Sequence, residues 1–208
     1  MTRIVDALNA ALRRAPVWPW YILGAIPAAY WFWAAFANRL GADPVARLEH
    51  ELGLLALQLL IAALAVTPLR ELARINLLRY RRMLGLMAFF YVVLHIFVWL
   101  AFDRQYDWPR ILADLYKRPY IMLGMAAFVL LVPLALTSNA WSIRRLGAMS
   151  WRKLHRLAYP AAALAALHFL WLVKSWPPEP LVYGGIVAAL LLYRSVRGRM
   201  RRRSRLAY

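Results

Sequence analysis

The sequence predicts an all-α, polytopic membrane protein, a bundle of six transmembrane helices with both termini in the cytoplasm. Three observations support this fold class. Of the 208 residues, 63% are hydrophobic and only 17% are charged, an apolar share far above that of an ordinary soluble domain. Apolar runs of roughly 20 residues recur along the chain, each long enough to cross a hydrocarbon core about 30 Å thick. The basic residues cluster at alternate ends of these runs.

Each predicted span has its own boundaries. In chain order the spans cover residues 18–37, 50–67, 83–102, 119–137, 154–173 and 181–196. The first is bounded by tryptophans and is not a cleavable signal, because Trp31 and Trp33 stand where a small-residue cleavage site is expected. The second opens at LEHELG, the third follows RYRR, the fourth follows LYKR, the fifth follows WRK, and the sixth ends at the basic run RGRMRRRSR. We therefore expect a cytoplasmic N-terminal segment (1–17), a six-helix transmembrane domain (18–196) and a basic cytoplasmic tail (197–208).

The charge distribution orients the predicted bundle. The net charge is +18, and 20 Lys and Arg fall on one side of the membrane with only Asp6 and Glu71, whereas the other side carries 7 basic and 7 acidic residues. The positive-inside rule places the basic side in the cytoplasm. Such a distribution argues against nucleic-acid binding and favours contact of the tail with anionic lipid. The absence of cysteine excludes disulfides, thiol chemistry and cysteine-ligated iron–sulfur clusters.

Two histidines lie deep inside the predicted spans, away from the span ends. An imidazole in hydrocarbon needs a hydrogen-bond partner or a metal, so each of them requires an explanation. His95 lies 13 residues past Arg82 and His168 lies 12 past Arg156, on helices that run in the same direction. At about 1.5 Å per residue, both rings lie roughly 18 to 20 Å from the cytoplasmic boundary, at one depth in the outer half of the membrane.

Small side chains accompany both histidines. Ala88 lies seven residues before His95, and Ala161 and Ala165 lie seven and three residues before His168. Small residues leave room for a flat macrocycle held between the two imidazoles in a bundle core. An iron with two imidazole ligands has no open position, which suits electron transfer. The alternative is that each histidine bonds a neighbouring helix and that the small residues mark tight helix packing.

The sequence indicates a function for the other two histidines, His155 and His50, less strongly. His155 lies near the cytoplasmic end of its span, level with Arg81, so a second cofactor at that end is one interpretation. The alternatives are an interfacial histidine that touches lipid headgroups and, for Arg81, a snorkelling arginine or a partner of a propionate or phosphate. His50 opens its span between two glutamates, and its polar setting accounts for it. A less favoured interpretation is that His50 belongs to an acidic docking surface with Asp43, Glu49 and Glu51.

Two further function classes stay open on residues alone. A small metal-ion transporter would use the intramembrane histidines as transient ligands, although the membrane core contains no carboxylates for hard cations and the chain has no thiols for soft ones. A structural subunit would only anchor another protein.

The segments RYRRMLGLMAFFYVVLHIFVW (79–99) and TSNAWSIRRLGAMSWRKLHRLAYPAAALAALHFLWLVK (137–174) resemble the ferric-reductase-like transmembrane family. Within it, the length and six-helix layout are most similar to the heme-binding subunits of bacterial periplasmic methionine-sulfoxide reductase systems. The resemblance implies a heme b protein of the inner membrane, with His95 and His168 as axial ligands, His155 as a third matching histidine, and FMN as a further cofactor. It implies electron flow from the quinone pool or a cytosolic flavin reductase to a periplasmic molybdopterin subunit, so this chain is not expected to reduce methionine sulfoxide by itself.

The chain departs from the broader family pattern in two places. Eukaryotic members carry two histidines on each of two helices, whereas the inner position of the third span is Arg81, so the resemblance leaves one or two hemes open. Those relatives also append flavin and nicotinamide domains, whereas this chain ends soon after its sixth span. A separate electron donor is therefore expected.

Overall fold

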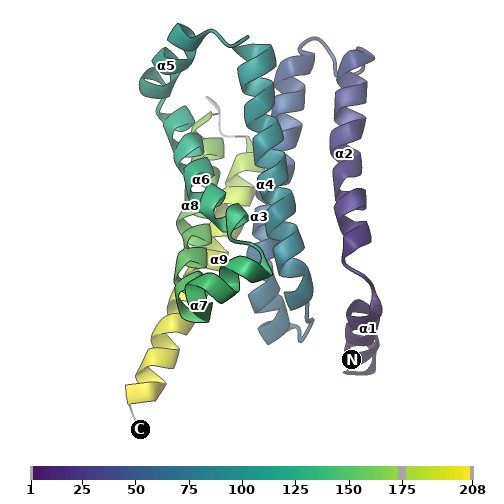
Figure 1. The fold of residues 1–208 in the computed structure, drawn as a ribbon, viewed down its shortest axis with the longest axis vertical. Helices are drawn as coiled ribbons and strands as arrows, with labels where there is room; N and C mark the ends of the chain where they lie inside the picture. Colours follow the sequence, from purple (N-terminus) through teal and green to yellow (C-terminus); the bar gives the residue numbers. More distant parts are fainter. Residues whose placement is uncertain (1, 173–176, 207–208) are drawn as a thin grey trace.

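The computed structural model describes residues 2–172 and 177–206, and every regular element in these ranges is a helix (Figure 1). The elements are α1 (Thr2–Arg14), α2 (Trp18–Phe36), α3 (Pro44–Leu72), η1 (Leu78–Tyr80), α4 (Arg81–Val98), η2 (Trp99–Asp103), α5 (Trp108–Lys117), α6 (Pro119–Leu136), α7 (Ala140–Leu154), η3 (His155–Leu157), α8 (Ala158–Leu172) and α9 (Pro178–Leu206). The all-α prediction is confirmed. The most extensive packing joins α3 to α4 and α6 to α8, and these two pairs form the centre of the bundle, with α2 against α3 and α4 and with α9 against α8 and α3.

Four of the described helical segments are long and apolar enough to cross a membrane, namely Pro44–Leu72, Leu78–Asp103, Pro119–Leu136 and Pro178–Met200. They correspond to four of the predicted spans, and the chain is an integral membrane protein. The 19-residue α2 is less hydropathic because it contains four tryptophans, two tyrosines and two prolines. The described part of α8 has 15 residues, since a 3₁₀ turn at His155–Leu157 precedes it and residue 173 lies outside the described ranges.

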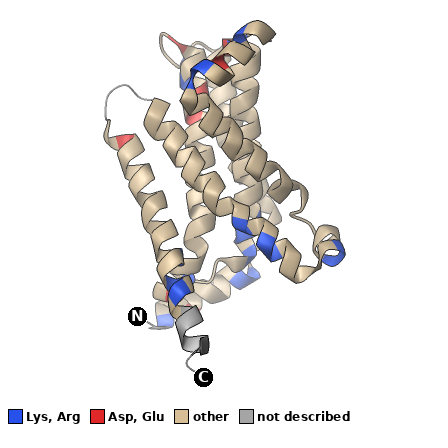
Figure 2. Cartoon of the chain, turned by 90° about the vertical axis from the view of Figure 1, so that its left-hand side faces the viewer, with Lys and Arg blue, Asp and Glu red and all other residues tan. Residues whose placement is uncertain are grey.

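Charged residues separate along the long axis of the bundle. Figure 2 shows Lys and Arg gathered toward the end where α1 and the last turns of α9 lie, while most of the Asp and Glu lie at the opposite end with a smaller number of basic residues. The two ends of the described chain therefore share one side of the bundle. The asymmetry seen in the sequence is preserved in space, and we refer below to the basic end as the inner end and to the opposite end as the outer end.

The start of α3 differs from the sequence prediction. The expected start at residue 50 is wrong by six residues, because Asp43 caps the helix by accepting a hydrogen bond from the Ala46 N–H (2.9 Å) and Pro44 occupies the first turn. As a result, Glu49 and His50 lie on the second turn of a helix rather than at its entrance.

The buried Tyr91 hydroxyl holds α4 against α2. It donates to the Gly24 carbonyl (2.5 Å) and accepts from the Ala28 N–H (3.2 Å), two groups that are four residues apart on α2. Pro27 interrupts the helical hydrogen bonds of α2 at this point, so the tyrosine satisfies backbone groups that the proline disturbs. This contact anchors α4 one turn before His95 and on nearly the same face, because residues four apart lie one above the other on a helix.

Besides α1, the helices α5 and α7 lie outside the predicted spans. The amphipathic α5 lies across the outer end, and Asp107 caps it. At the inner end α7 breaks at Gly147, whose φ of 74° is in the left-handed region that glycine tolerates best.

Candidate functional site

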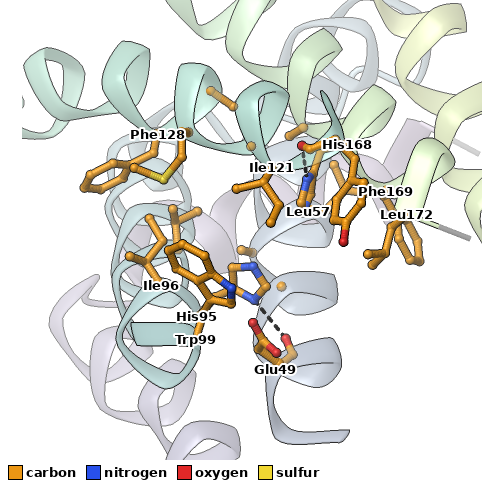
Figure 3. Close-up of a pocket in the computed structure, with 18 of the residues that line it drawn as sticks. Glu49, Leu57, His95, Ile96, Trp99, Ile121, Phe128, His168, Phe169 and Leu172 are labelled. Atoms are coloured by element: carbon orange, nitrogen blue, oxygen red, sulfur yellow. Dashed lines mark hydrogen bonds between the residues drawn. The ribbon is translucent and has the colours of Figure 1, made fainter. Parts of the chain in front are cut away.

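A cavity of about 380 Å³ lies between α3, α4, α6 and α8 in the outer half of the bundle (Figure 3). Most of its wall is apolar, with side chains such as Leu57, Ile96, Phe128 and Leu131. Its volume falls within the range typical of small-molecule sites. The cavity is therefore large enough for an organic cofactor and mostly suited to an apolar one.

The two imidazoles predicted to lie at one depth come together in this cavity. His95 enters from α4 and His168 from α8, with ring centres 6.3 Å apart and ring planes at 78° (Figure 3). The depth count placed them correctly because both helices rise at nearly the same rate per residue from the inner end. Their role as metal ligands stays a prediction.

Each imidazole is oriented by a backbone carbonyl of a neighbouring helix. His95 Nδ1 lies 2.9 Å from the Glu49 carbonyl oxygen, and His168 Nδ1 lies 2.7 Å from the Tyr120 carbonyl oxygen. A carbonyl oxygen only accepts, so Nδ1 carries the proton in both rings and the Nε2 lone pair is left to bind a metal. A backbone partner on Nδ1 is the usual way in which proteins orient a ligating histidine.

A glycine supports each ring from the same neighbouring helix. A Cβ on Gly53 would lie 3.0 Å from His95 Nδ1, and a Cβ on Gly124 would lie 2.9 Å from His168 Nδ1. Both distances are too short for an alanine to fit without movement. Each glycine follows the residue whose carbonyl accepts the imidazole hydrogen bond by four positions, so the two halves repeat one arrangement of carbonyl, glycine and histidine.

These glycines were missed by the sequence interpretation, which looked for small residues only on the histidine helices. The available signal was a glycine at the matching level of each partner helix. Of the three predicted alanines, Ala88 and Ala165 line the cavity. Ala161 is instead fully buried in the neighbouring hydrophobic core.

His155 and Arg81 lie at the inner end, away from the cavity. His155 Nε2 is 3.1 Å from the Thr137 hydroxyl, and its ring stacks on Trp151 with centres 3.8 Å apart. Arg81 is the first residue of α4. The structure does not bring these two residues to the His95–His168 pair, and their proposed part in a second cofactor site stays a prediction.

Two acidic residues near His50, Glu51 and Glu179, have partners within the protein. His50 lines the cavity with Nε2 3.6 Å from Glu179 Oε2, while Glu51 pairs with Arg47 at 2.6 Å. Glu49 also lines the cavity. An acidic docking surface at this place stays a prediction. Over the described ranges, no three His, Asp or Glu side chains meet in a group that would hold a metal ion.

Residues 50–166 match the family model described as ferric reductase like transmembrane component. The chain is also similar to curated proteins called protein-methionine-sulfoxide reductase heme-binding subunit MsrQ. It is 50% identical to the one from Brucella anthropi over 187 residues, which cover 90% of this chain and 84% of that protein. It is 51% identical to those from Brucella ovis and Brucella canis with the same coverage of both chains.

The chain thus belongs to the ferric-reductase-like transmembrane family, and within it to the MsrQ group. We call the carbonyl and glycine that flank each imidazole a cradle, formed by Glu49 and Gly53 on α3 and by Tyr120 and Gly124 on α6. The matched range contains the α6 cradle, Gly53 and His95, while Glu49 lies one residue before its start and His168 two residues beyond its end.

Proposed function

We propose that this chain is a heme b-binding electron-transfer subunit of the bacterial inner membrane, with His95 and His168 as the axial ligands of the heme iron. The single observation that carries the proposal is the pair of facing imidazoles, each with its Nδ1 proton committed to a backbone carbonyl. The heme-binding name of its relatives supports the choice of cofactor.

The dimensions of the site fit an iron between the rings. A metal lies about 2 Å from an imidazole nitrogen and that nitrogen about 1.2 Å from its ring centre, so two rings on one metal have centres about 6.4 Å apart. The observed separation is 6.3 Å. The apolar wall suits the faces of a porphyrin, and the two glycines let each ring stand close to the adjacent backbone.

A heme with two imidazole ligands has no open coordination position, so it supplies one-electron transfer rather than chemistry on a bound substrate. The protein supplies the rest. The carbonyls of Glu49 and Tyr120 hold the imidazoles in one tautomer and orientation. The apolar residues around them exclude water, and the four central helices fix the separation of the two rings.

The position of the site favours transfer toward the outer side. We propose six spans with both termini cytoplasmic, as the separation of charge in Figure 2 supports. In this arrangement 1–17 and 197–208 are the cytoplasmic segments and 18–196 the transmembrane domain. Electrons then enter at the inner end from quinol or a cytosolic flavin reductase. They leave at the outer end to the periplasmic molybdopterin subunit MsrP, which reduces oxidised methionine in proteins.

Two parts of the cofactor prediction need separate measurement. FMN is implied by the family resemblance, and flavin quantitation per polypeptide tests it. A second heme near His155 and Arg81 is tested by iron quantitation in the wild type and in His155→Ala. A drop of one iron per polypeptide on this substitution supports the second heme, and an unchanged value argues against it.

The experiment that tests the main proposal is optical spectroscopy of the purified full chain. His95→Ala and His168→Ala should each abolish the low-spin reduced bands and lower the heme content strongly. His50→Ala is the matched control, because it removes an imidazole from the same cavity wall and should retain the bands. Unchanged bands in both ligand variants would overturn the assignment. Colourless wild-type protein that moves zinc or copper across vesicles would favour the metal-transporter alternative.

A further inference from the structure

The polar groups of the cavity wall gather at its outer end. Three polar lining residues come from the connection between α4 and α6, namely Asp103, Arg104 and Arg118, and Tyr120 lies in the first turn of α6. The deeper wall is formed by side chains such as Leu60. A flat cofactor with one charged edge therefore has a preferred orientation in this cavity. Its apolar edge fits the deep end, and its charged edge belongs at the rim.

Two arginines of this rim are fixed by one buried carboxylate. Arg104 Nε lies 2.7 Å from Asp114 Oδ2, and Arg118 Nε lies 2.9 Å from Asp114 Oδ1. Asp114 is only 8% exposed. Since both guanidinium groups bind Asp114 through Nε, their terminal nitrogens are held in defined places beside the cavity.

Some N–H groups of these two arginines already have partners within the protein. One terminal nitrogen of Arg104 lies 3.2 Å from Asp103, and one of Arg118 donates to the Tyr120 hydroxyl at 3.1 Å. Among the described residues, Arg104 forms ion pairs with both Asp103 and Asp114, whereas Arg118 forms one only with Asp114. Arg118 therefore has fewer of its N–H donors engaged by carboxylates than Arg104 has.

We propose that Arg118, assisted by Arg104, forms a carboxylate-binding subsite that receives the propionate groups of the porphyrin. This inference rests on the proposed function, because it takes the ring held between His95 and His168 as its ligand. A planar guanidinium binds carboxylate through paired, charge-assisted N–H donors, which suits this role better than a point charge. The propionate edge of the ring thereby faces the outer end of the bundle.

Carboxylate groups near the two arginines oppose the binding of a further carboxylate. Asp103 also lines the cavity and repels an added carboxylate. The two arginines are already balanced by Asp103 and Asp114, so net charge does not attract the ligand. Binding depends on the directed N–H groups of Arg118, and loss of that one side chain should matter more than a general change of surface charge.

The test compares two porphyrins on the full chain prepared without heme. Iron protoporphyrin IX has free propionates, whereas its dimethyl ester has the same ring and iron without the charges. The wild type should bind the free acid roughly ten- to a hundredfold more tightly than the ester. Arg118→Gln should reduce this preference to near one while its affinity for the ester stays unchanged. Binding is followed by titration of the low-spin absorption bands.

Two further variants separate the role of Arg118 from an effect of general surface charge. Arg110→Gln removes an arginine of α5 whose side chain is 70% exposed, and it should keep the wild-type preference. Arg104→Gln should lower the preference less than Arg118→Gln does, and it serves as the second test if Arg118→Gln binds neither porphyrin.

The outcomes distinguish this inference from the proposed function. Equal binding of acid and ester by the wild type, with low-spin spectra for both, overturns the subsite and leaves the two histidine ligands in place. Failure of both porphyrins to give a low-spin spectrum overturns the proposed function itself. An equal loss of preference in Arg110→Gln and Arg118→Gln overturns the subsite in favour of general surface charge.

Discussion

The contact between Gly124 and His168 allows a prediction with a defined magnitude. In Gly124→Ala the new Cβ would lie 2.9 Å from His168 Nδ1 and 3.1 Å from Cε1. Ordinary contact between such atoms begins near 3.5 Å, so the imidazole must move by about 0.6 Å. The movement strains the 2.7 Å hydrogen bond to the Tyr120 carbonyl. Overpacking costs about 1 to 3 kcal/mol and a weakened hydrogen bond about 1 kcal/mol more.

We therefore expect Gly124→Ala to lower heme affinity by roughly thirtyfold to several hundredfold, at about 1.4 kcal/mol per factor of ten. The low-spin electron paramagnetic resonance signal should shift, because the orientation of one axial imidazole changes. Gly85→Ala is the matched control, since a Cβ at Gly85 on α4 meets nothing within 4 Å. If Gly124→Ala and Gly85→Ala show the same heme content and the same signal, the glycine cradle does not position the ring.

Three further substitutions test one contact at the outer end of the bundle, one between α2 and α4, and one at the inner end. Asp114→Asn should destabilise the protein by about 3 kcal/mol in thermal unfolding, because it leaves two guanidinium groups without their shared carboxylate. Asp107→Asn is the control and should be nearly neutral, since asparagine also caps a helix. Tyr91→Phe should cost about 1 to 3 kcal/mol of unfolding free energy, because the Gly24 carbonyl and Ala28 N–H lose their buried partner; a melting temperature unchanged from the wild type would contradict that role. Thr137→Val should leave the low-spin signal unchanged, because its hydroxyl bonds His155 at the inner end; a shifted signal would mean that the two ends are coupled.

The sequence was sufficient to find the two central histidines. Their depth could be counted because helix rise is constant and because Arg82 and Arg156 mark a common boundary in the sequence. The count does not carry in the same way from His155 to His168, since the 3₁₀ turn at His155–Leu157 interrupts the α-helix between them. A periodicity argument holds only while the helix is continuous.

The features that escaped prediction depend on packing between helices. That Gly53 faces His95, and Gly124 faces His168, follows from the register of one helix against another, which no single segment contains. The early start of α3 is a different case. Its signal, an aspartate followed by a proline at Asp43 and Pro44, was present in the sequence and was overlooked in favour of the apolar run that begins later.

The two geometric properties of the histidine pair have separate physical origins. Ring orientation is set within each helix pair, because α3 supplies the carbonyl and glycine for His95 and α6 supplies them for His168. Ring separation is set between the pairs, where direct packing of α4 on α6 is much less extensive than packing within each pair. Asp114 links the pairs at the outer end, since Arg104 follows the helical segment that carries His95 and Arg118 caps the start of α6. A substitution in a cradle should therefore change the angle of one ring, whereas a substitution at Asp114 should change the gap that both rings share.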